Sequence, residues 1–63
     1  MKFVHFTDPD GHKVGINPDQ VADVRPAEPG VYDPRGRTVI MLASGYHVVR
    51  EDPEDVQRRL EGS

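Results

Sequence analysis

The chain has 63 residues, of which 30% are charged, and it contains no cysteine. A chain this short buries only about 60% of the surface that it exposes when unfolded, so we expect one small β domain spanning residues 1–63, with little stability to spare. Neither disulfide bonds nor thiolate zinc sites can stabilise it further. Oligomerisation is then the natural source of extra burial.

The net charge of −3 is unevenly distributed. Residues 1–50 carry six acids and six bases, whereas residues 51–63 carry five acids and two bases. Nucleic-acid-binding proteins usually present a basic patch or stripe to the phosphates, which this chain lacks, so a nucleic-acid partner is disfavoured. The first residues also lack the apolar run of a signal peptide or membrane span, and we expect a cytoplasmic protein with no membrane insertion.

The first part of the chain predicts a β-hairpin, a turn and a third strand. Residues 2–6 are rich in strand-forming side chains, and residues 8–11 contain the Pro and Gly of a tight reversal before the chain returns over residues 12–16. Residues 17–20 place an asparagine acceptor before a proline, a pattern that starts one helical turn or a β-turn. Residues 21–25 then form a short strand.

The middle of the chain predicts a loop and a second hairpin. From Pro26 to Gly36 there are three prolines and two glycines in eleven residues, a composition that excludes regular pairing. Residues 38–42 are apolar on both faces, which is typical of a central strand. After a turn at residues 43–45, residues 46–50 return as its partner.

Residues 52–61 predict a C-terminal helix. Asp52 is a good capping residue, and proline is tolerated at the first helical position, where Pro53 lies. Val56 and Leu60 lie four residues apart on one face. A helix this short must dock through that stripe. The predicted fold class is therefore mostly β with one C-terminal α-helix, as a small antiparallel sheet or a partly closed barrel of about five strands.

No pattern in the chain predicts catalysis or metal binding. The three histidines are His5, His12 and His47. They show no local ligand spacing, and a calcium loop counted from Asp8 would place Asp19 where a bidentate glutamate is required. Ser44 lies in a predicted tight turn, and a short chain does not readily enclose a catalytic pocket. We therefore expect no enzyme activity, no metal and no cofactor.

Four residues are candidates for contact with a partner. Val56 and Leu60 would form an apolar partner surface if the helix stripe were exposed. Arg35 and Arg37 would meet an anionic partner, although a solvated charge pair is the commoner explanation for such residues.

Self-association is expected from the two apolar faces of residues 38–42. One short helix shields only one face of a sheet, so the other needs a closed barrel or a second copy of the chain. A symmetric homodimer or higher oligomer is the commoner route to added burial.

The spacing of turn and strand residues resembles the small FlbD/SwrD-type flagellar proteins of bacteria. The shared motifs are Gly11-x-x-Val14-x-Ile16-Asn17-Pro18-Asp19-x-Val21 and Thr38-Val39-Ile40-x-Leu42-x-x-Gly45-x-x-x-Val49-x-Glu51-x-x-x-x-Val56. The resemblance implies an accessory role in flagellar function and swarming motility, with no catalytic residues. The loop from Pro26 to Gly36 is longer than the connection expected in that family.

A second resemblance points to another functional class. LytTR-type DNA-binding domains also combine short strands, an Ile-Asn-Pro-like turn and a glycine-containing hairpin, but this chain is shorter and lacks their basic surface. We therefore expect a non-enzymatic accessory or interaction module that acts by protein–protein contact, with a flagellar or motility role. The alternative is a small LytTR-like nucleic-acid-binding regulator.

Overall fold

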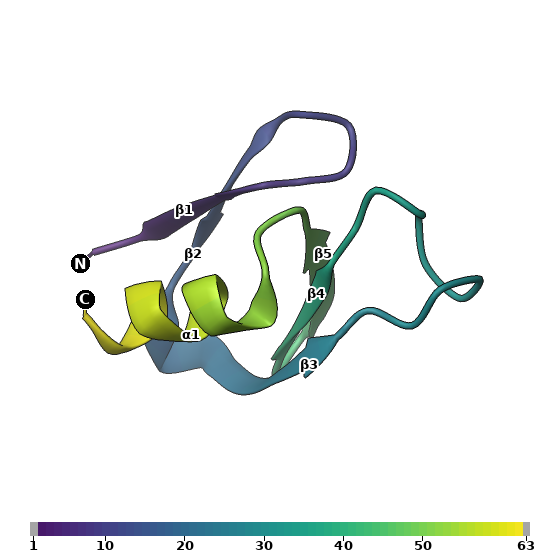
Figure 1. The fold of residues 1–63 in the computed structure, drawn as a ribbon. Coiled ribbons are helices and arrows are strands. Elements are labelled where there is room, and N and C mark those ends of the chain that lie inside the picture. Colours follow the sequence, from purple (N-terminus) through teal and green to yellow (C-terminus); the bar gives the residue numbers. More distant parts are fainter. Residues whose placement is uncertain (1, 63) are drawn as a thin grey trace.

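A computed structural model describes residues 2–62 (Figure 1). Its elements are β1 (Val4–Thr7), β2 (Lys13–Ile16), the 3₁₀ turn η1 (Pro18–Gln20), β3 (Val21–Pro26), β4 (Thr38–Leu42), β5 (Gly45–Val49) and α1 (Pro53–Glu61). The predicted mostly β fold with one C-terminal helix is confirmed. The strands form two small antiparallel sheets, β1–β2 and β3–β4–β5, which do not close into a barrel.

The β1–β2 hairpin is closed by local turn chemistry. The carboxylate of Asp8 accepts hydrogen bonds from the backbone N–H groups of Asp10 (3.0 Å) and His12 (2.8 Å). Gly11 has a φ of 93°, a conformation that side-chain-bearing residues rarely adopt. The carboxylate of Asp8 therefore serves the backbone reversal.

The second sheet has β4 at its centre, as the apolar character of both its faces predicts. The side chain of Asn17 accepts a hydrogen bond from the Asp19 N–H at 3.0 Å and starts η1, which leads directly into β3. In the register of the sheet, Ile40 lies opposite Val24 on one side and His47 on the other.

The core lies between the β1–β2 hairpin, α1 and one face of the three-stranded sheet (Figure 1). Its fully buried members are Phe6, Ile16, Ile40, Val49 and Val56. Val56 has no exposed surface, and Leu60 packs against the edge of the same cluster. The predicted docking of the helix stripe is confirmed.

Glu51 joins the two sheets and the helix. The Thr7 N–H donates to both oxygens of its carboxylate (3.0 and 3.1 Å), and the buried Thr38 hydroxyl donates to its backbone carbonyl at 2.6 Å. The Arg50 N–H donates to the Thr7 carbonyl at 2.8 Å. The short segment between β5 and α1 thus holds the end of β1 against the second sheet.

The loop between β3 and β4 covers part of the outer face of the second sheet. Alternation along β4 places Ile40 on the core face and Val39 on the outer face, yet Val39 is only 2% exposed. The loop shields this side chain within one chain, so the burial of Val39 requires neither a closed barrel nor a second copy, and self-association stays a prediction. Among residues 2–62, no helix combines the length and apolarity needed to span a membrane.

Candidate protein-interaction surface

The segment of residues 27–37 forms a compact loop whose ends meet. The Ala27 N–H donates to the Arg37 carbonyl at 3.0 Å and closes the base, while the Gly36 N–H donates to the Asp33 carbonyl at 2.8 Å and tightens the returning arm. Short loops with adjacent ends, packed by their own side chains, are frequently functional. We call residues 27–37 the Ω-loop.

Arg35 ties the Ω-loop to the turn of the first hairpin. Its Nη2 lies 3.0 Å from an Asp10 oxygen and 3.1 Å from an Asp33 oxygen. The hydrogen bond from the Arg35 side chain, followed by that from its backbone N–H, holds the pKa of Asp33 below its usual value. Arg50, which follows β5, contacts the same turn by donating to the Pro9 carbonyl at 2.6 Å. The structure therefore places the predicted partner residue Arg35 in intramolecular contacts.

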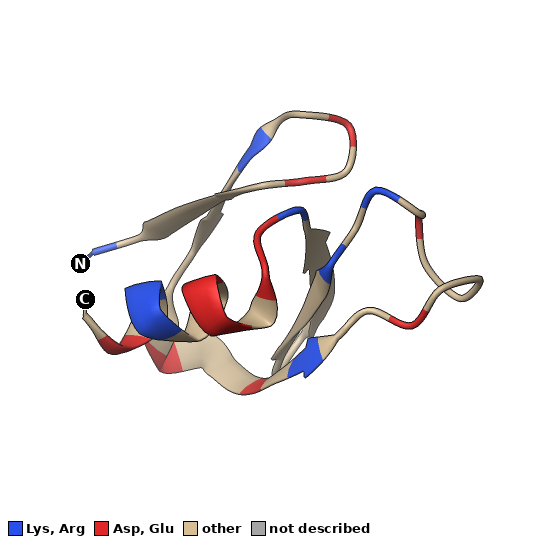
Figure 2. Ribbon diagram, in the orientation of Figure 1, with Lys and Arg blue, Asp and Glu red and all other residues tan. Residues whose placement is uncertain are grey.

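Arg37 does not join Arg35 in a cationic patch. Its Nη1 lies 3.8 Å from an Asp52 oxygen, and both side chains are about two-thirds exposed, so the pair contributes little to stability. A shallow depression of about 350 Å³ beside it is lined largely by prolines. Figure 2 shows acids and bases interspersed along this side of the molecule, as expected when each arginine has an acidic neighbour.

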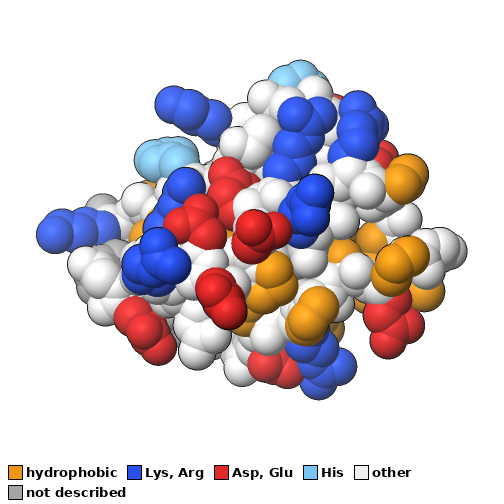
Figure 3. Space-filling view, in the orientation of Figure 1, with side chains coloured by type: hydrophobic (Ala, Val, Ile, Leu, Met, Phe, Trp, Pro, Cys, Tyr) orange, Lys and Arg blue, Asp and Glu red, His pale blue; other side chains and the backbone are white. Residues whose placement is uncertain are grey.

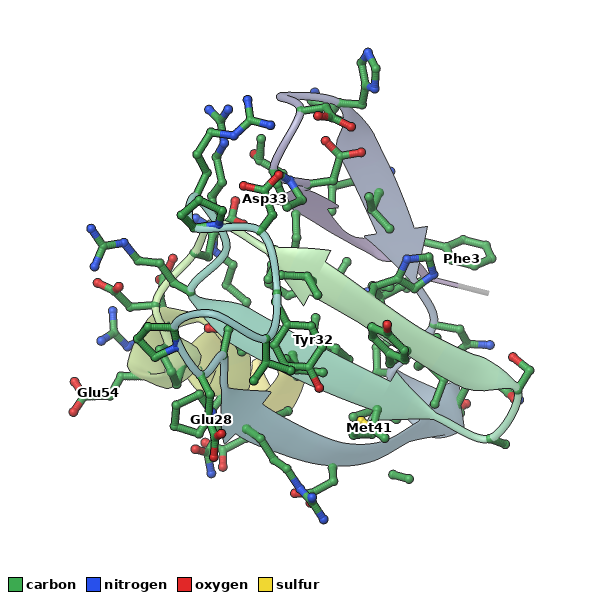
Figure 4. The ribbon with its side chains drawn as sticks, turned by 90° about the vertical axis from the view of Figure 1, so that its right-hand side faces the viewer. Phe3, Glu28, Tyr32, Asp33, Met41 and Glu54 are labelled. Carbon is green, nitrogen blue, oxygen red and sulfur yellow. The ribbon has the colours of Figure 1, made fainter. Side chains whose placement is uncertain are left out.

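The inner side of the Ω-loop is packed on the sheet by an aromatic pair and a glycine. The rings of Tyr32 and Tyr46 meet edge-on, with centroids 5.7 Å apart and planes at 71°. At Gly36, an added Cβ atom would lie 2.2 Å from the Cγ1 of Val48. Figure 4 shows Tyr32 reaching from the loop across the sheet toward Met41.

Four side chains form an apolar surface where the Ω-loop meets the outer face of the sheet: Val31, Tyr32, Met41 and Tyr46. We call these the loop surface. Val31 is 64% exposed and Tyr46 is 55% exposed. A pocket of about 240 Å³ opens between the loop, β3 and β4, and Arg25 and Glu28 are among its lining residues.

The composition of the loop surface is typical of protein interfaces, where tyrosine and methionine are enriched. Figure 3 shows apolar side chains gathering on the side of the Ω-loop, whereas charged side chains cover the helix. Tyr32, Met41 and Tyr46 were not predicted as partner residues from the sequence. The available signal was an aromatic residue inside a loop rich in proline and glycine.

The two predicted partner residues on the helix, Val56 and Leu60, differ in how far they are buried. Val56 is buried completely, so its side chain serves the core and offers no surface to a partner. Leu60 is partly exposed and lines a shallow groove of about 340 Å³ between α1 and β3.

Metal ligation has no geometric support within the described residues. Among residues 2–62, no group of three or more His, Asp or Glu side chains is arranged to hold a metal ion. His12 lies 3.8 Å from Asp8, the acid that organises the hairpin turn.

Comparison of the chain with known protein families, with curated proteins and with solved structures finds no match. Function is therefore inferred from the side chains themselves.

Proposed function

We propose that the protein is a non-enzymatic interaction module that binds a partner protein through the loop surface. The observation that carries this proposal is the exposure of Val31, on an Ω-loop that is itself held in place, beside the exposed Tyr46 of β5. Ion pairs to Asp10 and Asp33, the Tyr32–Tyr46 contact and the closed loop base restrict its motion. A loop ordered before binding loses less conformational entropy when a partner docks.

An accessory role in bacterial flagellar function or motility, with a cytoplasmic location, is part of the proposal. It is supported by the resemblance to FlbD/SwrD-type proteins. A LytTR-like nucleic-acid-binding role is less well supported, because Arg35 and Arg37 each lie beside an acid.

Self-association is included in the proposal. Arg25 and Glu28, of opposite charge, both line the pocket of the loop surface. A twofold-symmetric dimer brings the same surface of two copies together. Arg25 of one copy would then lie opposite Glu28 of the other, and their charges would be complementary. Sedimentation equilibrium at tens of micromolar tests this, because a dimer doubles the 7.1 kDa mass of the monomer.

Site-directed photo-crosslinking in cells tests the proposed function. A photoreactive residue at position 31 should form a discrete product with one partner, or with a second copy of the chain. The same residue at position 58, on the exposed helix surface, serves as the matched control. Val31→Asp combined with a crosslinker at position 46 should abolish the product. Identical products from positions 31 and 58, or none from position 31, would contradict the proposal.

A further inference from the structure

A second surface, separate from the loop surface, lies on the opposite side of β3. The groove of about 340 Å³ runs between β3 and α1, and Val21, Val24 and Leu60 supply its apolar lining. These three side chains pack against the core and keep part of their surface exposed in the groove. We call this surface the helix groove.

The helix groove carries negative charge and no positive charge. Asp23 and Glu61 line it, and no Lys or Arg among residues 2–62 does so. Arg25 partly neutralises Asp23 at 2.6 Å, whereas Glu61 forms no ion pair within the described residues, and neither does Asp19 in the adjoining η1. Figure 2 shows acids on β3 and at the end of α1.

The basic residues of α1 are directed elsewhere. Arg59 lies 5.7 Å from the centre of the Phe6 ring and donates to the His5 carbonyl at 3.3 Å, so its side chain lies against β1. Its ion pairs are with Glu51 and Asp55. Arg58, the other base of the helix, lies 3.9 Å from Asp55. The lining of the groove thus holds acids and, among the described residues, no base, which makes it complementary to a cationic ligand.

The edge of β3 is poorly suited to pairing with a further strand. Pro26 has no N–H, and the N–H of Val24 already donates to the Asp23 carboxylate at 2.8 Å. Edge strands protected in these ways resist strand addition. An apolar groove beside such an edge instead fits the side chains of an amphipathic helix.

We propose that the helix groove binds a basic amphipathic helix of another protein. Apolar side chains of that helix pack on Val21, Val24 and Leu60, while its lysines or arginines face Glu61 and Asp19. The proposal does not depend on the loop surface, since the two sites share no residue.

Peptide binding to the full chain tests the proposal. The probe is an 18-residue peptide of leucine and lysine with leucines spaced at i, i+3, i+4 and i+7, and binding is detected by two-dimensional NMR of ¹⁵N-labelled protein. We expect amide shifts concentrated in residues 21–24 and 57–61. A scrambled peptide of the same composition and an analogue with glutamate in place of lysine should each bind at least about tenfold more weakly, because they lack the apolar face or the favourable charge.

A pair of charge reversals separates specific docking from general attraction to an acidic protein. Glu61→Lys should weaken binding about fivefold, whereas Glu54→Lys, at an exposed acid on the same helix outside the groove, should change it less than about twofold. Equal effects of the two variants, equal binding of the scrambled peptide, or shifts centred on Val31 and Tyr46 would overturn the proposal. The last result would instead support the loop surface, so failures of the two proposals are distinguishable.

Discussion

Gly36 is a residue at which the Ω-loop approaches the sheet closely. Any larger side chain there would overlap the Cγ1 of Val48, since a Cβ atom would come within 2.2 Å of it. Valine is branched at Cβ and has few alternative rotamers, so relief requires movement of the loop. Glycine is needed here for space rather than for an unusual backbone conformation.

Gly36→Ala should therefore lower the free energy of unfolding by about 1–3 kcal/mol, as overpacking does elsewhere. Urea denaturation measures the change. Val48→Ala in the same chain should restore part of the loss, giving a coupling energy in a double-mutant cycle. Gly15→Ala is the control, because no atom lies nearer than 3.7 Å to an added Cβ there. Equal losses at Gly36 and Gly15 would show that the overlap is unimportant.

Asp33 gives the Ω-loop a pH dependence whose sign follows from its contacts. The Arg35 side chain, followed by the Arg35 backbone N–H, lowers the pKa of Asp33 from 3.8. A carboxyl group with a depressed pKa stabilises the fold above its unfolded pKa, and this contribution is lost as pH falls through the folded pKa. The turn that Asp33 and Arg35 form inside the loop should therefore be unchanged from neutral pH to about pH 4 and weaken below it.

An NMR titration of the Arg35 amide checks this expectation. The amide should titrate with a midpoint below 3.8, and Asp33→Asn should remove the transition. A midpoint at or above 3.8 would contradict the inferred hydrogen bonding.

At the scale of elements, α1 depends on one completely buried side chain and one partly exposed side chain. Val56 is 0% exposed, whereas Leu60 lies at the margin of the core beside the helix groove. Shortening a buried side chain lowers the free energy of unfolding more where neighbouring atoms cannot move into the cavity and water cannot enter it. The smaller side chain is therefore the more important of the two.

Val56→Ala should lower the free energy of unfolding by about 2 kcal/mol. Leu60→Ala should lower it by less, although it removes more atoms. Thermal and urea unfolding of both variants, with Gln57→Ala as an exposed control on the same helix, measures the order. A larger loss for Leu60→Ala would mean that the groove is closed in solution.

At the scale of the whole molecule, most of the arginines lie beside acidic residues and do not form a basic patch. Arg25, Arg35 and Arg37 each lie within 4 Å of an aspartate. Phosphate contacts provide most of the non-specific affinity of nucleic-acid-binding proteins, and paired arginines must first give up an acidic neighbour to make them.

Binding to duplex DNA or RNA at physiological salt should therefore be weaker than about 100 µM, the weak end of ordinary non-specific affinity. Fluorescence anisotropy with labelled duplexes measures it. A micromolar complex that weakens steeply with salt would favour the LytTR-like alternative, and Arg35→Ala and Arg37→Ala would then locate the contact.

Most of the elements were predictable from the sequence because their causes are local. The first turn depends on Asp8 and Gly11, η1 on Asn17 before Pro18, and α1 on the Pro53 start, each acting within a few residues. The central position of β4 was also predictable, since a strand that is apolar on both faces needs cover on both.

The cover of the outer sheet face and both candidate sites was decided only by the tertiary structure. The prolines and glycines of residues 26–36 predict a loop, whose first residue, Pro26, the structure places at the end of β3, but they do not show where such a loop packs. Its position depends on partners distant in sequence, such as Asp10 for Arg35 and Tyr46 for Tyr32. The helix groove likewise exists because α1 docks beside β3, which places Glu61 near Asp23 across 38 positions of the chain. Contacts of this kind arise from packing of the whole chain, and no local pattern encodes them.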